Sequence, residues 1–115
     1  GNALDNILGG GDGDDWIMGD RGQDVLTGGA GIDTVSYANS KAGVTVKING
    51  DNFTGGNGGD AHGDGLQGFE NIVGSRFDDV LISIAAAQVN VIKGGAGNDI
   101  IEGGEAGDFL YGEAG

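Results

Sequence analysis

The stretch that decides the fold is GGDGDDWIM (10–18), GDRGQDVLT (19–27) and GGAGIDTVS (28–36), three nine-residue repeats in succession without a gap. The same period is found in five more places: GNALDNILG (1–9), GSRFDDVLI (74–82), AAAQVNVIK (85–93), GGAGNDIIE (94–102) and GGEAGDFLY (103–111). A short fixed period indicates a stack of similar units in which each unit contacts its neighbours.

Two columns of the repeat are nearly invariant within the chain. Position eight is always aliphatic: Leu8, Ile17, Leu26, Val35, Leu81, Ile92, Ile101 and Leu110. Position six is always Asp or Asn: Asn6, Asp15, Asp24, Asp33, Asp79, Asn90, Asp99 and Asp108. Positions one to six predict a turn in which Gly permits positive φ, and the last three residues predict a short strand whose middle side chain points inward.

This pattern predicts an all-β solenoid with one aliphatic layer as its core. Because successive strands must reverse direction around a thin coil, two repeats complete one 18-residue circuit and alternate repeats stack in parallel. We treat residues 1–115 as a single roll with repeats at 1–36, an irregular connection at 37–73 and truncated repeats at 74–115. Within the connection, 43–48 predicts a strand with Val44, Val46 and Ile48 inward, 49–65 a loop, and 66–73 a return to the roll.

Composition excludes several classes of protein. The chain has 115 residues with 28 Gly, no Pro and no Cys, and its formal net charge is −13. Collagen, disulfide frameworks and thiolate metal sites are excluded, and this charge opposes nucleic-acid binding, so we expect cations as partners. No apolar run approaches the roughly 20 residues of a membrane span. Because the first residue is Gly1 rather than Met, we expect a segment of a longer polypeptide.

The acidic turns need a counter-charge. One aliphatic layer is too thin to offset the loss of chain entropy, and stacking acidic turns brings like charges together. Backbone carbonyls and carboxylates without Cys or a His cluster are hard oxygen donors, which suit Ca²⁺ better than Zn²⁺ or copper. Mg²⁺ fits less well because it requires a strict octahedron.

Three of the repeats, GGDGDDWIM, GGAGIDTVS and GGAGNDIIE, resemble the GGxGxDxUx nonapeptide of the RTX, or hemolysin-type calcium-binding, repeat family. The resemblance covers 1–36 and 74–115 directly. It implies a right-handed parallel β-roll with two repeats per turn, made by a bacterium, secreted through a type I pathway to the extracellular space or cell surface, and folded by Ca²⁺ there.

The resemblance also implies the ligands, which are the position-six side chain and the carbonyls of the turn. The side chains are Asn6, Asp15, Asp24, Asp33, Asp79, Asn90, Asp99 and Asp108. The carbonyls are those of Gly11, Gly13, Gly22, Gly29, Gly31, Gly95, Gly97 and Gly104. The expected pairs across stacked turns are Asp15 with Asp33, Asn6 with Asp24, Asp79 with Asp99, and Asn90 with Asp108, which gives four to six Ca²⁺ ions.

Some assignments stay open at this point. Repeats 1–9 and 85–93 either hold an ion or serve only as structural rungs, and Asp20 replaces the second Gly of its repeat. In the connection, Asp60, Asp64 and Glu70 either coordinate an additional ion or are solvated loop carboxylates, and the second interpretation is favoured. The only histidine, His62, is expected to be exposed and to play no part in a zinc or catalytic site.

Function is expected to be calcium binding rather than catalysis, because neither HExxH nor GxSxG is present. The leading hypothesis is a module that folds on Ca²⁺ and supports the secretion and stability of a larger protein. The alternative is a Ca²⁺-dependent adhesin or uronate-polysaccharide-binding module, with a carbohydrate or a neighbouring domain as partner. Such a partner would contact the outward position-seven residues: Ile7, Trp16, Val25, Ile100 and Phe109.

Overall fold

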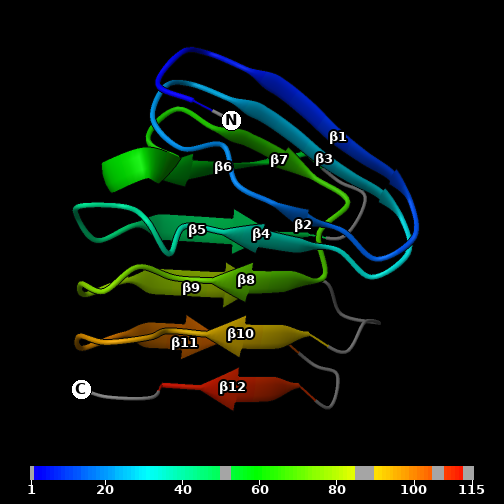
Figure 1. Cartoon of the computed structure of the whole chain (residues 1–115). Helices are drawn as coiled ribbons and strands as arrows, with labels where there is room; N and C mark the ends of the chain where they lie inside the picture. The colour runs from blue at the N-terminus through cyan, green and yellow to red at the C-terminus, as the bar shows by residue number, and fades with distance from the viewer. Residues whose placement is uncertain (1, 50–52, 85–89, 105–107, 113–115) are drawn as a thin grey trace.

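The computed structural model describes residues 2–49, 53–84, 90–104 and 108–112, and it is built almost entirely of short β-strands (Figure 1). The strands are β1 (Ile7–Asp12), β2 (Trp16–Ile17), β3 (Val25–Ala30), β4 (Thr34–Ser36), β5 (Thr45–Ile48), β6 (Thr54–Asn57), β7 (Gly65–Gln67), β8 (Asn71–Val73), β9 (Val80–Ser83), β10 (Val91–Lys93), β11 (Ile100–Glu102) and β12 (Phe109–Tyr111). A single 3₁₀ turn, η1 (Gly59–Ala61), follows β6. The all-β class expected from the sequence is confirmed.

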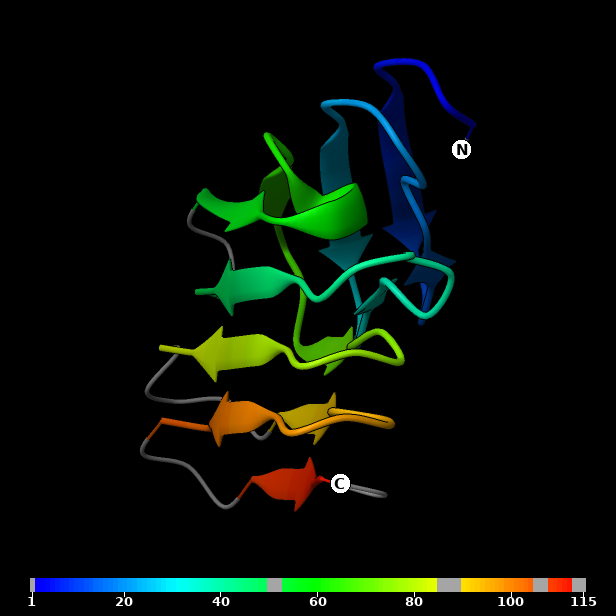
Figure 2. The same cartoon turned by 90° about the vertical axis from the view of Figure 1, so that its left-hand side faces the viewer.

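The strands form two sheets that share one core. One sheet has seven strands in the order β1-β3-β7-β6-β5-β9-β11, and the other has five in the order β12-β10-β8-β4-β2. In the lower half of Figure 2 the sheets appear as two columns of strands that run down the molecule. Successive repeats contribute strands to opposite sheets, as β1, β2, β3 and β4 do.

Strand pairing follows the repeat. The pairs β1–β3, β2–β4 and β10–β12 are parallel with partners 18 residues apart, such as Ile7 opposite Val25. The pairs β8–β10 and β9–β11 are also parallel, with partners 20 residues apart. The two extra residues are Ser83 and Ile84, which interrupt the nine-residue period. Within the repeat blocks, paired strands are therefore two repeats apart, with two residues added where the period is broken. The pairs β3–β7, β4–β8 and β5–β9, which involve strands of the connection, are 40, 37 and 35 residues apart.

The core is a column of position-eight side chains between the sheets. Leu26, Val35, Leu81 and Ile92 are fully buried. The position-seven residues expected to face outward are exposed: Ile7, Trp16, Val25, Ile100 and Phe109. Leu110 is an exception to the expectation for position eight, because it is 45% exposed on β12, the outer strand of its sheet. The connection adds the largest buried side chains, Tyr37 and Phe69, so the core is thickest there.

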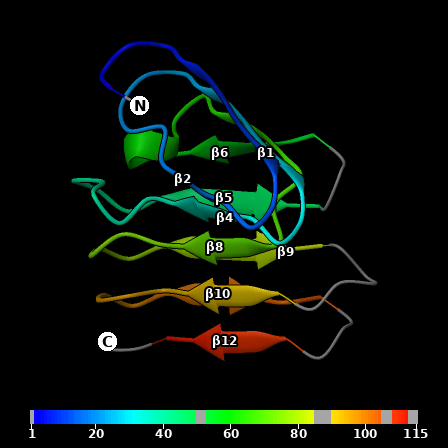
Figure 3. The same ribbon diagram turned by 45° about the vertical axis from the view of Figure 1, so that its right-hand side comes forward.

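The connection differs from expectation at one point. The strand predicted within 43–48 is confirmed as β5, with Val44, Val46 and Ile48 buried and Lys47 exposed. The prediction of a loop over 49–65 is wrong, because β6 and η1 lie within it and β7 begins at its end. Strand β6 is antiparallel to both β5 and β7, so the seven-stranded sheet is mixed rather than purely parallel. Figure 3 shows β6 above β5, at the boundary between the two parallel stacks.

Within the part of the chain that the structure describes, no helix has the length and hydropathy needed to cross a membrane.

Candidate metal-binding turns

The position-six side chains form ladders between stacked turns. In each ladder, the backbone N–H of one position-six residue donates to the carboxylate of its neighbour. The four expected pairs are all joined in this way: Asn6 to Asp24 (2.8 Å), Asp15 to Asp33 (2.8 Å), Asp79 to Asp99 (3.0 Å) and Asn90 to Asp108 (2.8 Å). One carboxylate oxygen, Oδ1, is thereby used to hold successive circuits in register.

The second carboxylate oxygen, Oδ2, is left over in four turns. Among the described residues, Oδ2 of Asp15, Asp24, Asp33 and Asp99 is buried and has no hydrogen-bond partner. Leaving a buried charged oxygen without a donor is costly, and native structures avoid it unless an ion or water completes the site. Each of these turns therefore presents one buried carboxylate oxygen that only an ion or a water could satisfy.

The glycine at position one leaves room for this oxygen. A Cβ added to Gly10 would lie 2.5 Å from Oδ2 of Asp15, and one added to Gly28 would lie 2.7 Å from Oδ2 of Asp33. The same holds at three other position-one glycines, where an added Cβ would lie against the carboxylate five residues later: Gly19, Gly94 and Gly103. The position-one column is thus explained by the carboxylate that folds back over it.

The turn glycines predicted as carbonyl ligands all adopt a left-handed backbone. Positive φ, between 85° and 121°, is found at Gly11, Gly13, Gly22, Gly29, Gly31, Gly95, Gly97 and Gly104. Asp20 takes the same position as Gly11 and Gly29 in its own repeat and also has positive φ, 66°. Positive φ costs free energy for a residue with a side chain, such as Asp20. The contacts between stacked turns, and not glycine alone, therefore impose the turn conformation.

Three predicted ligands are already satisfied by protein groups. Asp79 accepts hydrogen bonds on both carboxylate oxygens. The Asn90 side chain donates to the carbonyl oxygen of Glu70 and accepts from Ser83 Oγ at 2.8 Å. Asn6 Oδ1 accepts from the N–H of Asn2 at 3.0 Å. These groups present no orphaned buried oxygen, and the first part of repeat 85–93 lies outside the described residues.

Sequence analysis missed a second ladder at position five. Asp5, Asp14 and Asp78 accept from the backbone N–H of the residue one circuit ahead, at 2.8, 2.9 and 2.8 Å. These bonds run opposite to the position-six bonds, so stacked turns are joined in both directions. In the sequence, this ladder is visible only as an acidic residue at position five, immediately before the position-six residue.

The connection also continues the ladders. Asp64 Oδ1 accepts from the N–H of Asp24, and a carboxylate oxygen of Glu70 accepts from the N–H of Asp33, both at 2.8 Å. Asp64 and Glu70 are 3% and 7% exposed, so their interpretation as solvated loop carboxylates is wrong. His62 is exposed as expected, with Nδ1 2.9 Å from Asn57 Oδ1.

Burial dominates the electrostatics of the turns. It raises the pKa of Asp24 and of Asp99, although a backbone N–H bond to each partly opposes the shift. Burial also raises the pKa of Asp64 to about 6, against hydrogen bonds from Asp24 N–H and Tyr37 Oη. Tyr37 lies beside this carboxylate, and its pKa is raised by burial and by the Asp64 charge. Burying the charges of Asp24 and Asp99 costs free energy that a bound cation would offset.

The donor set fits calcium. No group of three or more His, Asp or Glu side chains converges as a metal site among the described residues, so any ion here takes part of its ligands from the backbone. Ca²⁺ accepts six to eight oxygens in variable geometry, including backbone carbonyls. One orphaned carboxylate oxygen and the backbone carbonyls of the left-handed turns would supply ligands of this kind.

A family model described as the RTX calcium-binding nonapeptide repeat matches residues 1–35 and 86–115 in four copies, more than half of the chain. The chain belongs to the RTX calcium-binding nonapeptide repeat family. The resemblance found in the sequence is thus confirmed, and the acidic turns of this RTX chain are those of a calcium-binding module. RTX repeat proteins are typically secreted by bacteria. No curated protein matches the chain at a significant level.

The raised pKa values predict that acid stabilises the metal-free RTX fold. A carboxyl whose pKa is higher in the folded than in the unfolded state binds more protons when folded, so stability is greatest below the unfolded value near 3.9 and is lost as pH rises through the folded value. For Asp64 this window lies between about 4 and about 6. We expect metal-free protein to have more β-structure at pH 4.5 than at pH 7, as measured by far-UV circular dichroism.

A variant separates this local effect from general charge repulsion. Asp64→Asn keeps an oxygen for the Asp24 N–H and carries no charge, so it should flatten the pH dependence of folding between about pH 4 and about pH 6, where the whole shift amounts to up to about 3 kcal/mol. Lys47→Gln, at an exposed site, serves as a comparison that changes charge elsewhere. A metal-free wild type that becomes more stable from pH 4.5 to pH 7 would contradict the prediction.

Proposed function

We propose that this RTX chain is a folding switch operated by Ca²⁺. The observation that carries the proposal is the set of four buried, unpartnered Oδ2 atoms, on Asp15, Asp24, Asp33 and Asp99. Without a cation, these charges and a net charge of −13 oppose the compact state. A bound Ca²⁺ supplies the positive charge that makes burial of these carboxylates favourable, so that binding and folding become one event.

The proposed fold is a right-handed parallel β-roll in which each 18-residue circuit adds two turns. It is supported by the 18-residue register of three strand pairs and by the left-handed glycines of the stacked turns. The residues that would hold ions are the four aspartates with free Oδ2, together with the carbonyls of their own and adjacent turns. We infer about four ions in the described residues, and Asp108 adds a candidate fifth.

The proposed setting is the outside of a bacterial cell, after export by a type I pathway. Extracellular Ca²⁺ modules bind with Kd values of about 10⁻⁴ to 10⁻³ M, so the chain would stay unfolded at submicromolar cytosolic Ca²⁺ and fold at millimolar Ca²⁺ outside. The compartment then determines the state of the chain. We propose no catalytic role for this segment, and any enzymatic activity would belong to the rest of a larger protein.

The direct test is far-UV circular dichroism of the metal-free chain during a Ca²⁺ titration, with Mg²⁺ at equal ionic strength as the control. We expect a cooperative gain of β-structure with Ca²⁺ and little change with Mg²⁺. A metal-free chain that already has its full β-content at pH 7, unchanged by Ca²⁺, would refute the proposal.

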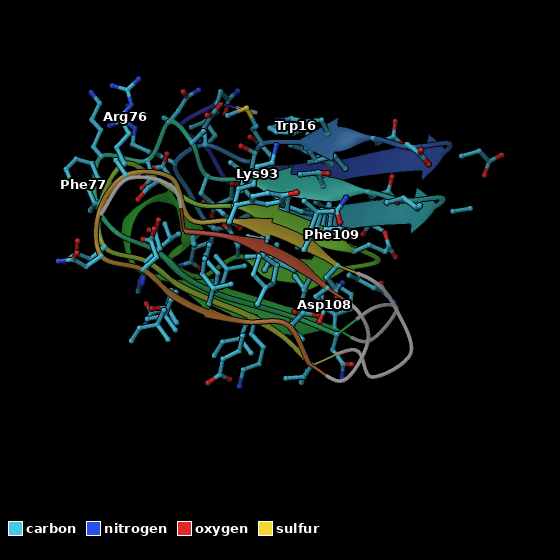
Figure 4. All side chains as sticks on the ribbon, turned by 90° about the horizontal axis from the view of Figure 1, so that it is seen from below. Trp16, Arg76, Phe77, Lys93, Asp108 and Phe109 are labelled. Carbon is cyan, nitrogen blue, oxygen red and sulfur yellow. The ribbon has the colours of Figure 1, made fainter. Side chains whose placement is uncertain are left out.

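The outward face of the five-stranded sheet supports a second candidate function, the binding of a carbohydrate. A groove of about 160 Å³ on this face is lined by Trp16, Thr34, Asn71, Val73, Val91 and Lys93. Trp16 is 59% exposed at one side, and Phe109 is 55% exposed farther along the same face (Figure 4). Apolar rings beside hydroxyl, amide and ammonium groups suit a sugar ring, and no carboxylate lines the groove.

This second candidate is tested by calorimetric titration of the Ca²⁺-loaded chain with neutral glucan and uronate oligosaccharides. Binding that Trp16→Ala removes, without a change in the Ca²⁺ midpoint, would support it. Phe77→Ala is the matched control, because Phe77 is exposed at the opposite end of the strands (Figure 4). A module with folding as its sole role should bind neither oligosaccharide.

A further inference from the structure

Turn 74–79 differs in backbone conformation from the four turns whose aspartate has a free Oδ2. In turn 74–79, positions two and four are Ser75 and Phe77, and neither has positive φ. In the four turns whose aspartate has a free Oδ2, positions two and four are both left-handed. These pairs are Gly11 and Gly13, Asp20 and Gly22, Gly29 and Gly31, and Gly95 and Gly97.

Ser75 uses the carboxylate that the other turns leave open. Its N–H donates to Asp79 Oδ2 at 2.8 Å, and its hydroxyl donates to Asp79 Oδ1 at 2.7 Å. The same hydroxyl accepts from the N–H of Phe77 at 3.0 Å, and the N–H of Val44 adds a further bond to Asp79 Oδ1 at 2.8 Å. Ser75 and Asp79 are 3% and 1% exposed. The turn is closed by its own hydrogen bonds.

The two kinds of turn therefore differ in what satisfies the carboxylate. In the four turns with left-handed positions two and four, no described donor reaches Oδ2, whereas in turn 74–79 a backbone N–H and a hydroxyl satisfy the carboxylate. Because a carboxylate with its oxygens satisfied by buried protein donors gains less from a cation, Asp79 fits Ca²⁺ poorly. We propose that turn 74–79 binds no Ca²⁺. The hydrogen bonds of Ser75 let this turn form without an ion, and the calcium-dependent turns then stack on it.

The surroundings of this turn support the same assignment. The carboxylate of Asp64 is also satisfied by protein donors, the N–H of Asp24 and the hydroxyl of Tyr37, each at 2.8 Å. The thickest part of the core, with Tyr37 and Phe69, belongs to the same middle region. Apolar burial and protein hydrogen bonds can hold this region together with less help from an ion. The inference rests on the proposed function, because it assumes that the remaining turns bind Ca²⁺.

The test converts the turn to the repeat consensus. The double variant Ser75→Gly/Phe77→Gly removes the hydroxyl and permits left-handed φ at both positions, so calorimetric titration should detect one more Ca²⁺ per chain than in wild type. Phe77→Gly alone retains Ser75 and is the matched control, with an unchanged number of ions. An equal number of ions in wild type and the double variant would overturn the inference.

A second measurement does not depend on the folding of any variant. In metal-free wild type, hydrogen exchange should be slower at the amide of Val80, which donates to the Val44 carbonyl at 2.9 Å, than at that of Val25, which donates to the Asn6 carbonyl at 2.8 Å. Equal exchange at the two amides would overturn the inference even if Ca²⁺ binding by the whole chain were established. A wild type that binds no Ca²⁺ in the first experiment would refute both this inference and the proposed function.

Discussion

Replacing Asp15 and Asp33 together by Asn is expected to abolish the Ca²⁺-dependent folding of the first repeat block. Both residues have a buried Oδ2 without a partner, and Asp33 Oδ1 accepts the N–H of Asp15. Asn retains Oδ1 for the ladder bond and removes the charge that would attract the ion. The loss can then be assigned to ion binding rather than to the ladder.

The size of this effect follows from mass action. An ion present at 100 times its Kd stabilises the folded state by about 2.7 kcal/mol, so two lost ions amount to about 5 kcal/mol. That is comparable with the whole free energy of unfolding of a small domain, roughly 5–15 kcal/mol. Without metal the sign should reverse, because the variant no longer buries two charges. Urea denaturation in Ca²⁺ measures the lost stabilisation, and far-UV circular dichroism of the metal-free chains measures the reversed effect.

The matched control for this experiment removes two charges that are exposed. Asp12→Asn/Glu102→Gln changes the net charge by the same amount, and both side chains face solvent. It should shift the Ca²⁺ midpoint only slightly, since exposed charges are screened by salt. If the two double variants had the same midpoint, the assignment of Asp15 and Asp33 as ligands would be wrong.

Gly29→Ala is expected to destabilise the Ca²⁺-loaded chain by about 3–5 kcal/mol. Gly29 has φ of 108°, a region that costs a residue with a side chain about 1–2 kcal/mol. The added Cβ would also collide with the carbonyl oxygen of Gly11 in the stacked turn, and this atom belongs to the backbone. Relief of the collision requires the two circuits to separate, which breaks the pairing of β1 with β3.

Gly9→Ala provides the comparison for this prediction. No heavy atom lies within 4 Å of the position that its Cβ would take, and Gly9 is not among the residues with positive φ. Stability should stay the same or increase by about 0.4–1 kcal/mol, because Ala lowers the entropy of the unfolded chain. Thermal unfolding of both variants in saturating Ca²⁺ measures the difference. Equal unfolding temperatures would show that the turns do not stack as closely as described.

The parts of the fold that repeat could be predicted from the sequence. Leu26 and Val35 are buried as their column requires, and Trp16 and Ile100 are exposed as theirs requires. These positions are set by local geometry, because each column places one kind of side chain on one side of a short strand. The same regularity brought the position-six residues into register.

The irregular parts could not be predicted, because contacts distant in sequence decide them. Strand β6 has the sequence TGGN, which carries no apolar alternation, and it forms a strand only because β5 and β7 lie on either side of it. Asp64 and Glu70 join the ladders at separations of 40 and 37 residues, which no short period reveals. The role of Ser75 depended on two hydrogen bonds within a turn that lacked its glycines.

The direction of the position-six ladder has a consequence for the order in which the chain can fold during synthesis. The backbone N–H of Asn6 has no acceptor until Asp24 has been synthesised, 18 residues later. The backbone N–H of Asp24 has none until Asp64 has been synthesised, 40 residues later. A nascent chain that grows from its N-terminus therefore always ends in a circuit whose amides are incomplete. Folding must lag behind translation by at least one circuit, because the circuit made last keeps open amides until the next circuit has been synthesised.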